Sequence, residues 1–365
     1  MPLTDDGRVA TVALLALAAA ALYLASRAAA GALTGWAAAD ATSRDTPGRR
    51  AVGHWIPVAA TAIVAAARNE PELAVAVAFG TSVACLSLVL GALNLLAPMG
   101  PPPERRRTWP FVLPAALLLL IAGFSGHLSW IHALALLLLG CALAAAWREP
   151  ALREVPRDVS DGPVAALPAQ PLDATGDGTN DPPPAWAKGA EIVLCVALAV
   201  IGGWTAVSAA AKAEAVSHVV APGLFSVLIL SPLLTLPLLN PASPEQAAQT
   251  TPSQVSTLVG IVLLNLCLLL PAVTFYWYLK TGFGALPALY KTTFGSAVLA
   301  LRDNARPLPY PLTSWRIDSV FLTVLGFAFV PVALGRWAIG KWEAGALIAG
   351  YLVYLMVVAL ATFRV

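Results

Sequence analysis

The stretch that decides the fold is ARNEPELAVAVAFGTSVACLSLVLG, residues 67–91. Its polar segment, RNEPE, separates two apolar runs and leaves room only for a tight helical hairpin. The second run contains Gly80, Thr81 and Ser82 but no charged residue beyond the turn. The hydroxyls of Thr81 and Ser82 lie inside a helix long enough to cross a bilayer. The stretch therefore predicts a buried polar site where an ion could bind.

The composition places the whole chain in a membrane. Of 365 residues, 58% are hydrophobic and only 12% are charged. A soluble domain of this length does not need so large an apolar fraction. The net charge of +2 is too small to indicate nucleic acid as a partner. The sequence therefore predicts an all-α polytopic membrane protein whose main partner is the lipid bilayer.

A membrane-spanning helix needs roughly 20 mostly apolar residues, and about ten segments meet that requirement. They are approximately 9–33, 52–68, 73–97, 109–125, 129–147, 189–211, 219–240, 255–279, 318–335 and 342–363. The first leaves a second interpretation open, because Arg8 before an apolar run also fits a signal peptide. Segment 148–187 is rich in Pro, Asp and Gly and is predicted to be a disordered linker.

The linker divides the chain into two halves, 1–147 and 188–365, each with five predicted helices. An odd number of spans gives the halves opposite orientations in the membrane, which makes an inverted repeat. Lys and Arg gather in the loops on the linker's side, which predicts a cytoplasmic linker and two external termini in a multi-pass protein of the cell membrane. Segment 280–304 is predicted to be an insertion, and residues 285–301 within it are predicted to form an interfacial or re-entrant helix.

One spacing repeats in the two halves. The same interval separates Pro57 from Gly80 and Pro237 from Gly260. The two repeat signatures cover about 52–97 and 219–279. We expect these helices to pack together at the centre of the protein, with both glycines buried. Each proline lacks an N–H and is expected to break its helix and free backbone carbonyl groups.

At these residues the chain resembles the calcium/cation antiporter superfamily in its prokaryotic sodium/calcium exchanger form. The first signature of that family looks like G-T-S-x-P-E, then a turn of the R-G-E-P-D type, then G-S-N-x-x-N. Here RNEPELAVAVAFGTSVACLSLVLG is similar to the turn and the following helix. Later segments, such as SGHLSWIHALALLLLG and GRWAIGKWEAGALIAGYLVYLM, are similar to other spans of the family. The resemblance implies an antiporter with two inverted repeats and a central ion site.

The departures from that family concern the groups that would neutralise an ion. The acids that the family places after the two prolines correspond to Val58 and Leu238. Trp55 and His54 stand where the family has small hydroxyl residues, and we expect them to fill the site. The remaining candidate ion ligands are all neutral: Thr81, Ser82, Thr235 and Asn265.

Calcium takes six to eight oxygen ligands, several of them usually carboxylates. At about 4 Å and an effective dielectric constant near 20, each opposite charge contributes about 4 kcal/mol of gross attraction, so two missing acids remove roughly 8 kcal/mol. The acids considered as replacements lie toward the ends of predicted spans or in the loops between them: Glu70, Glu72, Glu191, Glu214 and Glu343. We expect Arg68 to cap or pair with the first two across the hairpin turn.

The sequence thus predicts a sodium/calcium exchanger-like transporter that does not use calcium and that antiports a monovalent cation or a proton. The alternative is a non-transporting membrane scaffold or regulatory protein that keeps the exchanger fold. An enzyme is not expected, because the chain has no HExxH pair, GxSxG elbow or P-loop. The four cysteines and four histidines are scattered, so the sequence predicts no metal site and no cofactor, and it indicates no protein partner.

Overall fold

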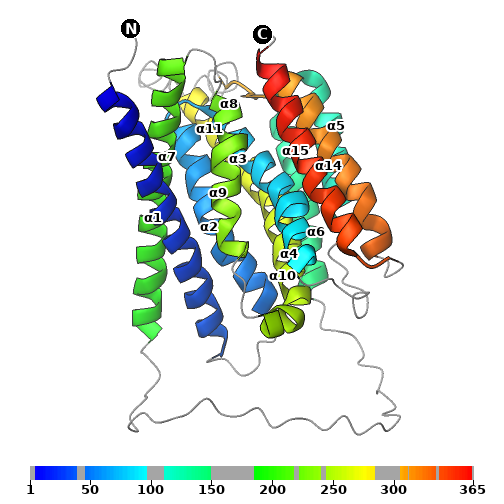
Figure 1. The fold of residues 1–365 in the computed structure, drawn as a ribbon. Coiled ribbons are helices and arrows are strands. Elements are labelled where there is room, and N and C mark those ends of the chain that lie inside the picture. Colours follow the sequence, from blue (N-terminus) through cyan, green and yellow to red (C-terminus); the bar gives the residue numbers. More distant parts are fainter. Residues whose placement is uncertain are drawn as a thin grey trace, which may run out of the picture.

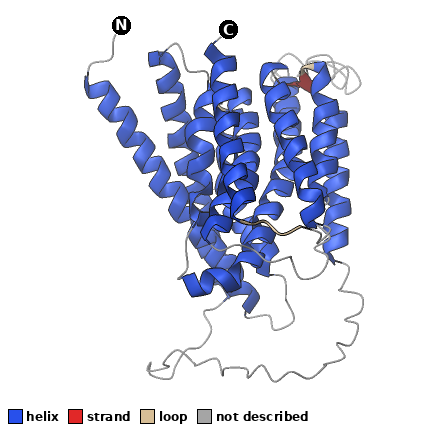
Figure 2. Ribbon diagram, turned by 45° about the vertical axis from the view of Figure 1, so that its right-hand side comes forward, coloured by secondary structure: helices blue, strands red, loops and turns tan. Residues whose placement is uncertain are grey.

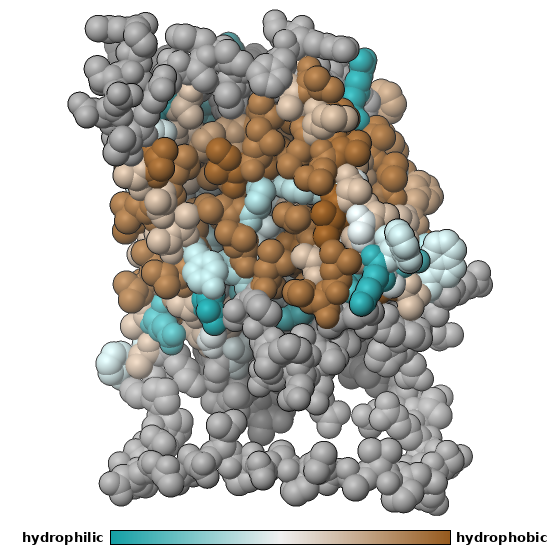
Figure 3. Space-filling model, in the orientation of Figure 1, coloured by the Kyte–Doolittle hydropathy of each residue, from teal (hydrophilic) through white to brown (hydrophobic). Residues whose placement is uncertain are grey.

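A computed structural model describes residues 5–38, 46–96, 111–148, 185–217, 222–239, 244–283, 305–310, 312–333 and 337–363. Over these residues the protein is a bundle of long helices that run roughly along one direction (Figures 1 and 2). Apolar side chains cover most of the described surface on the face drawn in Figure 3. Such a surface is suited to lipid, and every helix satisfies its own backbone groups there.

The helices of the first half follow the predicted spans closely. They are α1 (Asp5–Ala38), α2 (Thr46–Ala67), α3 (Pro71–Ala84), the π-helical turn η1 (Cys85–Val89), α4 (Leu90–Leu96), α5 (Val112–Ala122), the 3-10 turn η3 (Gly123–Ser125) and α6 (Trp130–Arg148). α3, η1 and α4 form one continuous rod, which begins directly after the turn that ends α2. In that turn Asn69 has a φ of 67°, a left-handed conformation that asparagine tolerates better than most residues.

The second half contains two further rods that are interrupted by π-helical turns. Its elements are α7 (Ala185–Ser217), α8 (Pro222–Phe225), η4 (Ser226–Leu230), α9 (Ser231–Thr235), the 3-10 turn η5 (Leu236–Leu239), α10 (Pro244–Leu264), η6 (Asn265–Leu269), α11 (Leu270–Phe283), α14 (Leu312–Ala333) and α15 (Lys341–Phe363). One rod comprises α8, η4 and α9, and the other comprises α10, η6 and α11.

Within the described ranges, six helical stretches are long and apolar enough to cross a bilayer, judged by length and composition. They are Thr11–Thr34, Gly48–Ala67, Pro71–Leu96, Gly189–Ala213, Gln254–Gly282 and Lys341–Ala361. Shorter apolar helices cover Val112–Ser125, Trp130–Ala142 and Gly223–Leu239. The multi-pass character is therefore confirmed, while the number of ten crossings stays a prediction.

Several predicted boundaries are wrong. α6 extends through Arg148 and α7 begins at Ala185, so helix replaces both ends of the predicted linker. α10 begins at Pro244, well before the predicted start at residue 255, because a proline in the first turn of a helix loses no intrahelical hydrogen bond. α11 continues to Phe283, into the predicted insertion. Residues 149–184 and 284–304, which carry the linker and the interfacial-helix predictions, lie outside the described residues.

A short strand pair is the one departure from an all-α fold among the described residues. β1 (His127–Leu128) pairs antiparallel with β2 (Leu308–Pro309), so that His127 faces Pro309 across the pair. The pair lies at one end of the bundle (Figure 2). The Tyr310 N–H extends it with a hydrogen bond of 3.2 Å to the carbonyl of Gly126. This contact fixes the chain just before α14 against the turn that precedes α6.

α1, α2 and α7 pack side by side, and α2 also contacts α3 and α10. Gly53 allows the close approach of α2 to α1, because a Cβ atom at this position would lie 2.5 Å from the Cα atom of Ala30. Close contact of small residues is the usual basis of helix association in lipid, where the exclusion of water contributes little. α1 and α7 begin at opposite ends of the bundle, as expected of equivalent helices in an inverted repeat (Figure 1).

The centre of the bundle is α3. Every residue of this helix from Leu73 to Ala84 is buried, and so is Gly260 in α10. α3 packs against η4 and α9 on one side and against η6 on another. The prediction that the two repeat signatures meet at the centre, with both glycines buried, is therefore confirmed.

Candidate functional site

Asn265 joins the two halves of the protein at the centre of the bundle. Its side-chain amide donates hydrogen bonds to the hydroxyl oxygens of Thr81, at 2.9 Å, and Ser82, at 3.2 Å. All three side chains are fully buried. The structure thus brings together three of the four candidate ligands, two from the first half of the sequence and one from the second. We call these three residues the central cluster.

The hydrogen bonds of the central cluster leave one strong acceptor unused. The Thr81 hydroxyl donates to the Val77 carbonyl at 2.6 Å, and the Ser82 hydroxyl donates to the Ala78 carbonyl at 2.7 Å. The amide oxygen Oδ1 of Asn265 is buried and has no hydrogen-bond partner among the residues that the structure describes. A buried acceptor without a donor costs about 1–3 kcal/mol. A bound cation or a protonated group would remove that cost, so this atom marks the cluster as a candidate binding site.

Thr235, the fourth candidate, does not join the central cluster through any described hydrogen bond. Its hydroxyl donates within α9, to the carbonyls of Ser231 at 3.1 Å and Pro232 at 2.9 Å. The hydroxyl oxygen of Ser231 is itself buried without a partner, and so is that of Ser226 one turn earlier. Two unsatisfied hydroxyls therefore lie on the η4–α9 rod, which packs against α3. The sequence analysis includes neither serine among the candidate ligands, because serines on helices commonly bond to their own backbone.

Both repeat helices change to π-helical geometry at equivalent places. η1 begins at Cys85 and η6 begins at Asn265, and the interval between them equals the one that separates Gly80 from Gly260. π-helical turns inside α-helices occur frequently at functional sites. The turn at Asn265 starts at the residue that carries the bridging amide. No residue pattern in the sequence predicts these turns, because they depend on how the rod packs against its neighbours.

The two lost acid positions lie in elements that touch the π-helical turns of the opposite half. Val58 is 2% exposed within α2, which contacts η6, and Leu238 is partly buried within η5, which contacts η1. The prediction that Pro57 breaks its helix is wrong, since α2 continues from Thr46 to Ala67. Its carbonyl instead accepts a hydrogen bond of 2.8 Å from the Thr61 hydroxyl. Pro237 lies in the 3-10 turn that ends α9.

His54 does not fill the central cluster. Its Nδ1 atom forms a hydrogen bond of 2.7 Å with the hydroxyl of Ser26, so the ring faces α1. Trp55 packs against the hydrophobic core, and its Nε1 atom is buried without a partner. The prediction that both side chains fill the site is therefore wrong for His54, and for Trp55 it stays a prediction.

Gly80 permits α3 to lie against Ser231, and we expect its substitution to disturb that contact. A Cβ atom at Gly80 would overlap the Ser231 hydroxyl and would lie 3.1 Å from the Ser231 Cβ atom. Gly80→Ala should lower the stability by about 1–3 kcal/mol, because α3 or α9 must move to make room for the added methyl group. Thermal unfolding in detergent would measure this change. Gly31→Ala is the matched control, since no atom lies within 4 Å of a Cβ there. Equal effects of both substitutions would contradict the close contact.

Comparison with known proteins supports the resemblance seen in the sequence. The model of the family described as "Sodium/calcium exchanger protein" matches residues 10–145. The solved H+/Ca2+ exchanger CAX matches with a TM-score of 0.65 at 12% identity, over 97% of this chain and 86% of its own. The chain has the fold of the calcium/cation antiporter superfamily.

Structures of another exchanger give the same fold. The sodium-calcium exchanger NCX_Mj, soaked with 2.5 mM Na+ and 0.1 mM Ca2+, matches with a TM-score of 0.51 at 15% identity, over 94% of this chain and 97% of its own. The form soaked with 100 mM Na+ and 10 mM Sr2+ matches with a TM-score of 0.52 at 16% identity. No curated protein sequence matches the chain. At these identities the likeness concerns the exchanger fold.

In this exchanger fold, Asp318 is the ionisable residue that the sequence analysis missed. The predicted span at 318–335 starts at this residue, whereas α14 begins at Leu312 and places it well inside the helix. Its side chain is 3% exposed, and its Oδ1 atom accepts a hydrogen bond of 2.8 Å from the Tyr354 hydroxyl. No cationic side chain among the described residues pairs with it. An Asp within the apolar run LTSWRIDSVFLTVLGF was the signal available in the sequence.

Aromatic side chains enclose Asp318 and connect it to the central helix of the exchanger fold. The ring of Tyr354 lies 6.1 Å from that of Tyr351, measured between centroids. Tyr310, close enough to interact with the charge of Asp318, stacks on Phe79 of α3 with 5.2 Å between ring centroids. The Tyr310 hydroxyl is buried without a hydrogen-bond partner. Tyr310 thus lies between a contact with α3 and the neighbourhood of the acid.

Glu343 lies at a helix end, as predicted, whereas Glu214 lies within α7 and not in a loop. Glu343 accepts a hydrogen bond of 2.9 Å from the Gly340 N–H at the start of α15. Arg68 donates to the hydroxyl of Ser208 in α7, and its pairing within the hairpin turn stays a prediction. No group of three or more His, Cys, Asp or Glu that could hold a metal ion occurs in the described part of the chain.

Proposed function

We propose that this protein is an exchanger-like antiporter that moves a monovalent cation or a proton and does not transport calcium. One observation carries the proposal. The central cluster offers two hydroxyls and one amide, and the amide oxygen of Asn265 is buried and lacks a donor. These groups suit a weakly charged ligand, because they supply oxygen atoms without negative charge.

The same geometry argues against calcium. A divalent ion beside these three residues would keep both of its charges uncompensated in a low-dielectric core. The elements that carry Val58 and Leu238 contact the π-helical turns, which supports the inference that the lost acids are missing near the central cluster. Solved exchangers of this fold exchange Ca2+ with H+ or with Na+ according to their names. We infer that this chain still transports the monovalent ion, H+ or Na+, and no longer transports Ca2+.

Asp318 is the residue that we propose to bind the transported proton. An ionised carboxylate at membrane depth without a cation is costly, so this group is stable when protonated or when a cation lies beside it. The ionisable side chains recorded next to it are tyrosines, Tyr354 of α15 and Tyr310 beside β2, and the Tyr351 ring lies beside that of Tyr354. The described part of α5, which also packs on α14, has no ionisable side chain.

The domain and membrane arrangement is part of the same proposal. Residues 1–147 and 188–365 form two inverted halves, joined by a cytoplasmic linker in the cell membrane, with both termini outside. The opposite directions of α1 and α7 support the inversion. Loops rich in Lys and Arg support the orientation.

Ion flux in proteoliposomes tests the transport proposal. The purified protein is reconstituted, and uptake is measured with gradients of calcium, sodium, potassium and protons in turn. We expect proton- or sodium-coupled flux that exceeds that of protein-free vesicles, and no calcium uptake. Robust sodium-driven calcium uptake would show that the charge argument is wrong. Absence of flux for all four ions would favour the alternative of a non-transporting scaffold that keeps the exchanger fold.

A further inference from the structure

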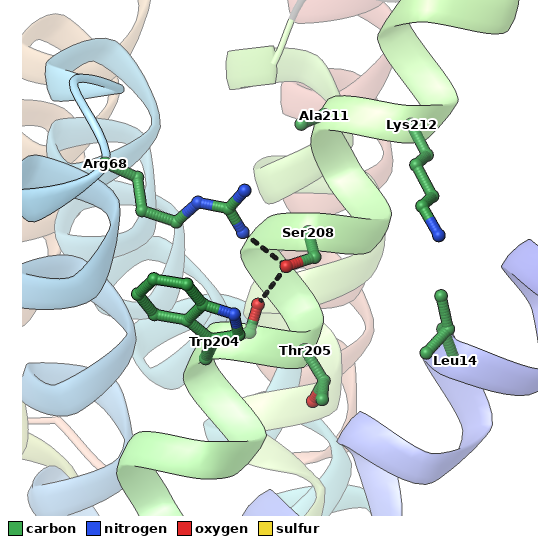
Figure 4. A pocket seen from close by; sticks show the side chains of 7 residues that line it. All are labelled: Leu14, Arg68, Trp204, Thr205, Ser208, Ala211 and Lys212. Atoms are coloured by element: carbon green, nitrogen blue, oxygen red, sulfur yellow. Dashed lines mark hydrogen bonds between the residues drawn. The ribbon is translucent and has the colours of Figure 1, made fainter.

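A second site lies at the edge of the bundle, between α1, α7 and the turn after α2 (Figure 4). It is a pocket with a volume of about 510 Å³. Its lining residues are Leu14, Arg68, Trp204, Thr205, Ser208, Ala211 and Lys212. The pocket contains none of the candidate ion ligands, so its ligand does not depend on the ion that the protein transports.

Arg68 is held in place at one side of the pocket. Its guanidinium donates a hydrogen bond to the Ser208 hydroxyl, and its Cζ atom lies 4.7 Å from the centroid of the Trp204 ring. The Ser208 hydroxyl donates in turn to the Trp204 carbonyl at 2.7 Å. A guanidinium has five N–H donors in a fixed plane, so most of them remain available to a ligand.

Lys212 of α7 is the second cation in the lining of the pocket. Its side chain extends toward Leu14 of α1 (Figure 4). The lining contains two cations and no acidic residue. Two cations in the lining of one pocket favour an anion with several acceptor oxygens, as in a phosphate group.

The position of the pocket matches the level of lipid headgroups. The apolar stretch of α2 ends at Ala67, directly before Arg68, and that of α7 ends at Ala213, directly after Lys212. Trp204, which is 53% exposed, lies below the two cations, where the indole ring suits the membrane interface. The cations therefore lie where a spanning helix meets the headgroup layer.

Exposed apolar side chains also lie on both helices that flank the pocket. They include Leu17 and Leu24 on α1, and Val193, Leu194, Val200 and Ile201 on α7. We propose that the pocket binds the phosphate of an anionic phospholipid, whose acyl chains lie along these faces of α1 and α7. A free phosphate ion would use the two cations but not the apolar faces.

Lipid binding to the full-length protein in detergent tests this proposal. Native mass spectrometry would follow the binding of phosphatidylglycerol, of phosphatidylcholine and of inorganic phosphate. We expect phosphatidylglycerol to bind most tightly. The double variant Arg68→Gln with Lys212→Gln should bind it roughly 30-fold more weakly, since each interfacial cation contributes on the order of 1 kcal/mol. A thermal shift on addition of phosphatidylglycerol should be present in the wild type and absent in this variant.

Two further variants make the test specific. Arg316→Gln with Lys341→Gln removes the same number of charges from exposed sites at the starts of α14 and α15 and should leave lipid binding unchanged. Ala211→Phe keeps both cations but fills the pocket, and it should weaken binding as the double variant does. Equal losses in the two charge variants, or inorganic phosphate that binds as tightly as the lipid, would overturn the proposal. So would unchanged lipid binding by a folded Ala211→Phe protein.

Discussion

Replacing Val58 and Leu238 together by glutamate is expected to create calcium binding where the unmodified protein has none. Val58 lies buried in α2, which contacts η6, and Leu238 lies in η5, which contacts η1. Two carboxylates at these places would supply the negative charge that the central cluster lacks, with about 4 kcal/mol of gross attraction each. We expect a dissociation constant in the range of about micromolar to millimolar, measured with radioactive calcium.

The matched control places the same two acids on the other face of the same elements. Ile63 in α2 and Leu236 in η5 are 43% and 47% exposed, so Ile63→Glu with Leu236→Glu adds equal charge away from the centre. Calcium should stabilise only the Val58 and Leu238 variant against thermal unfolding. Calcium binding by the control variant, or none by a folded Val58 and Leu238 variant, would contradict the central position of the lost acids.

Asp318→Asn is expected to abolish proton-coupled flux while the protein remains folded. An amide oxygen can still accept the hydrogen bond from Tyr354, so the change removes the ionisable group and keeps the contact. Proteoliposomes that contain a pH-sensitive dye would measure the coupling. Infrared spectra over a pH series would also lose the band of a protonated carboxylic acid that is buried.

Two comparisons separate proton binding from a purely structural role of Asp318. Tyr354→Phe keeps the acid and removes its donor, so coupling should persist with an altered pH profile. Asp318→Leu leaves the Tyr354 hydroxyl buried without an acceptor and should cost about 1–3 kcal/mol of stability. If Asp318→Asn transports protons as the wild type does, the acid only supports the packing of α14 on α15.

The positions of most helices along the chain could be predicted from local sequence. The RNEPE turn has only enough residues for a tight connection, so α2 and α3 had to form a hairpin. Length and apolarity located the other helices, because a segment that crosses lipid must satisfy its backbone within itself. Helix ends were less predictable: polar residues after Pro244 are compatible with both helix and loop, and neighbouring elements decide between them.

The neutrality of the central cluster follows from the sequence by itself, because Thr81, Ser82 and Asn265 carry no charge wherever the chain places them. The same holds for Val58 and Leu238 at the positions of the lost acids. Only the tertiary structure decided which groups meet. It joined Asn265 to the hydroxyls of α3, buried Asp318 against Tyr354, and brought Arg68 to Ser208 of α7. These contacts join helices that are distant along the chain. Hydrophobic periodicity shows which face of a single helix is buried, so it does not identify the helix that packs against that face.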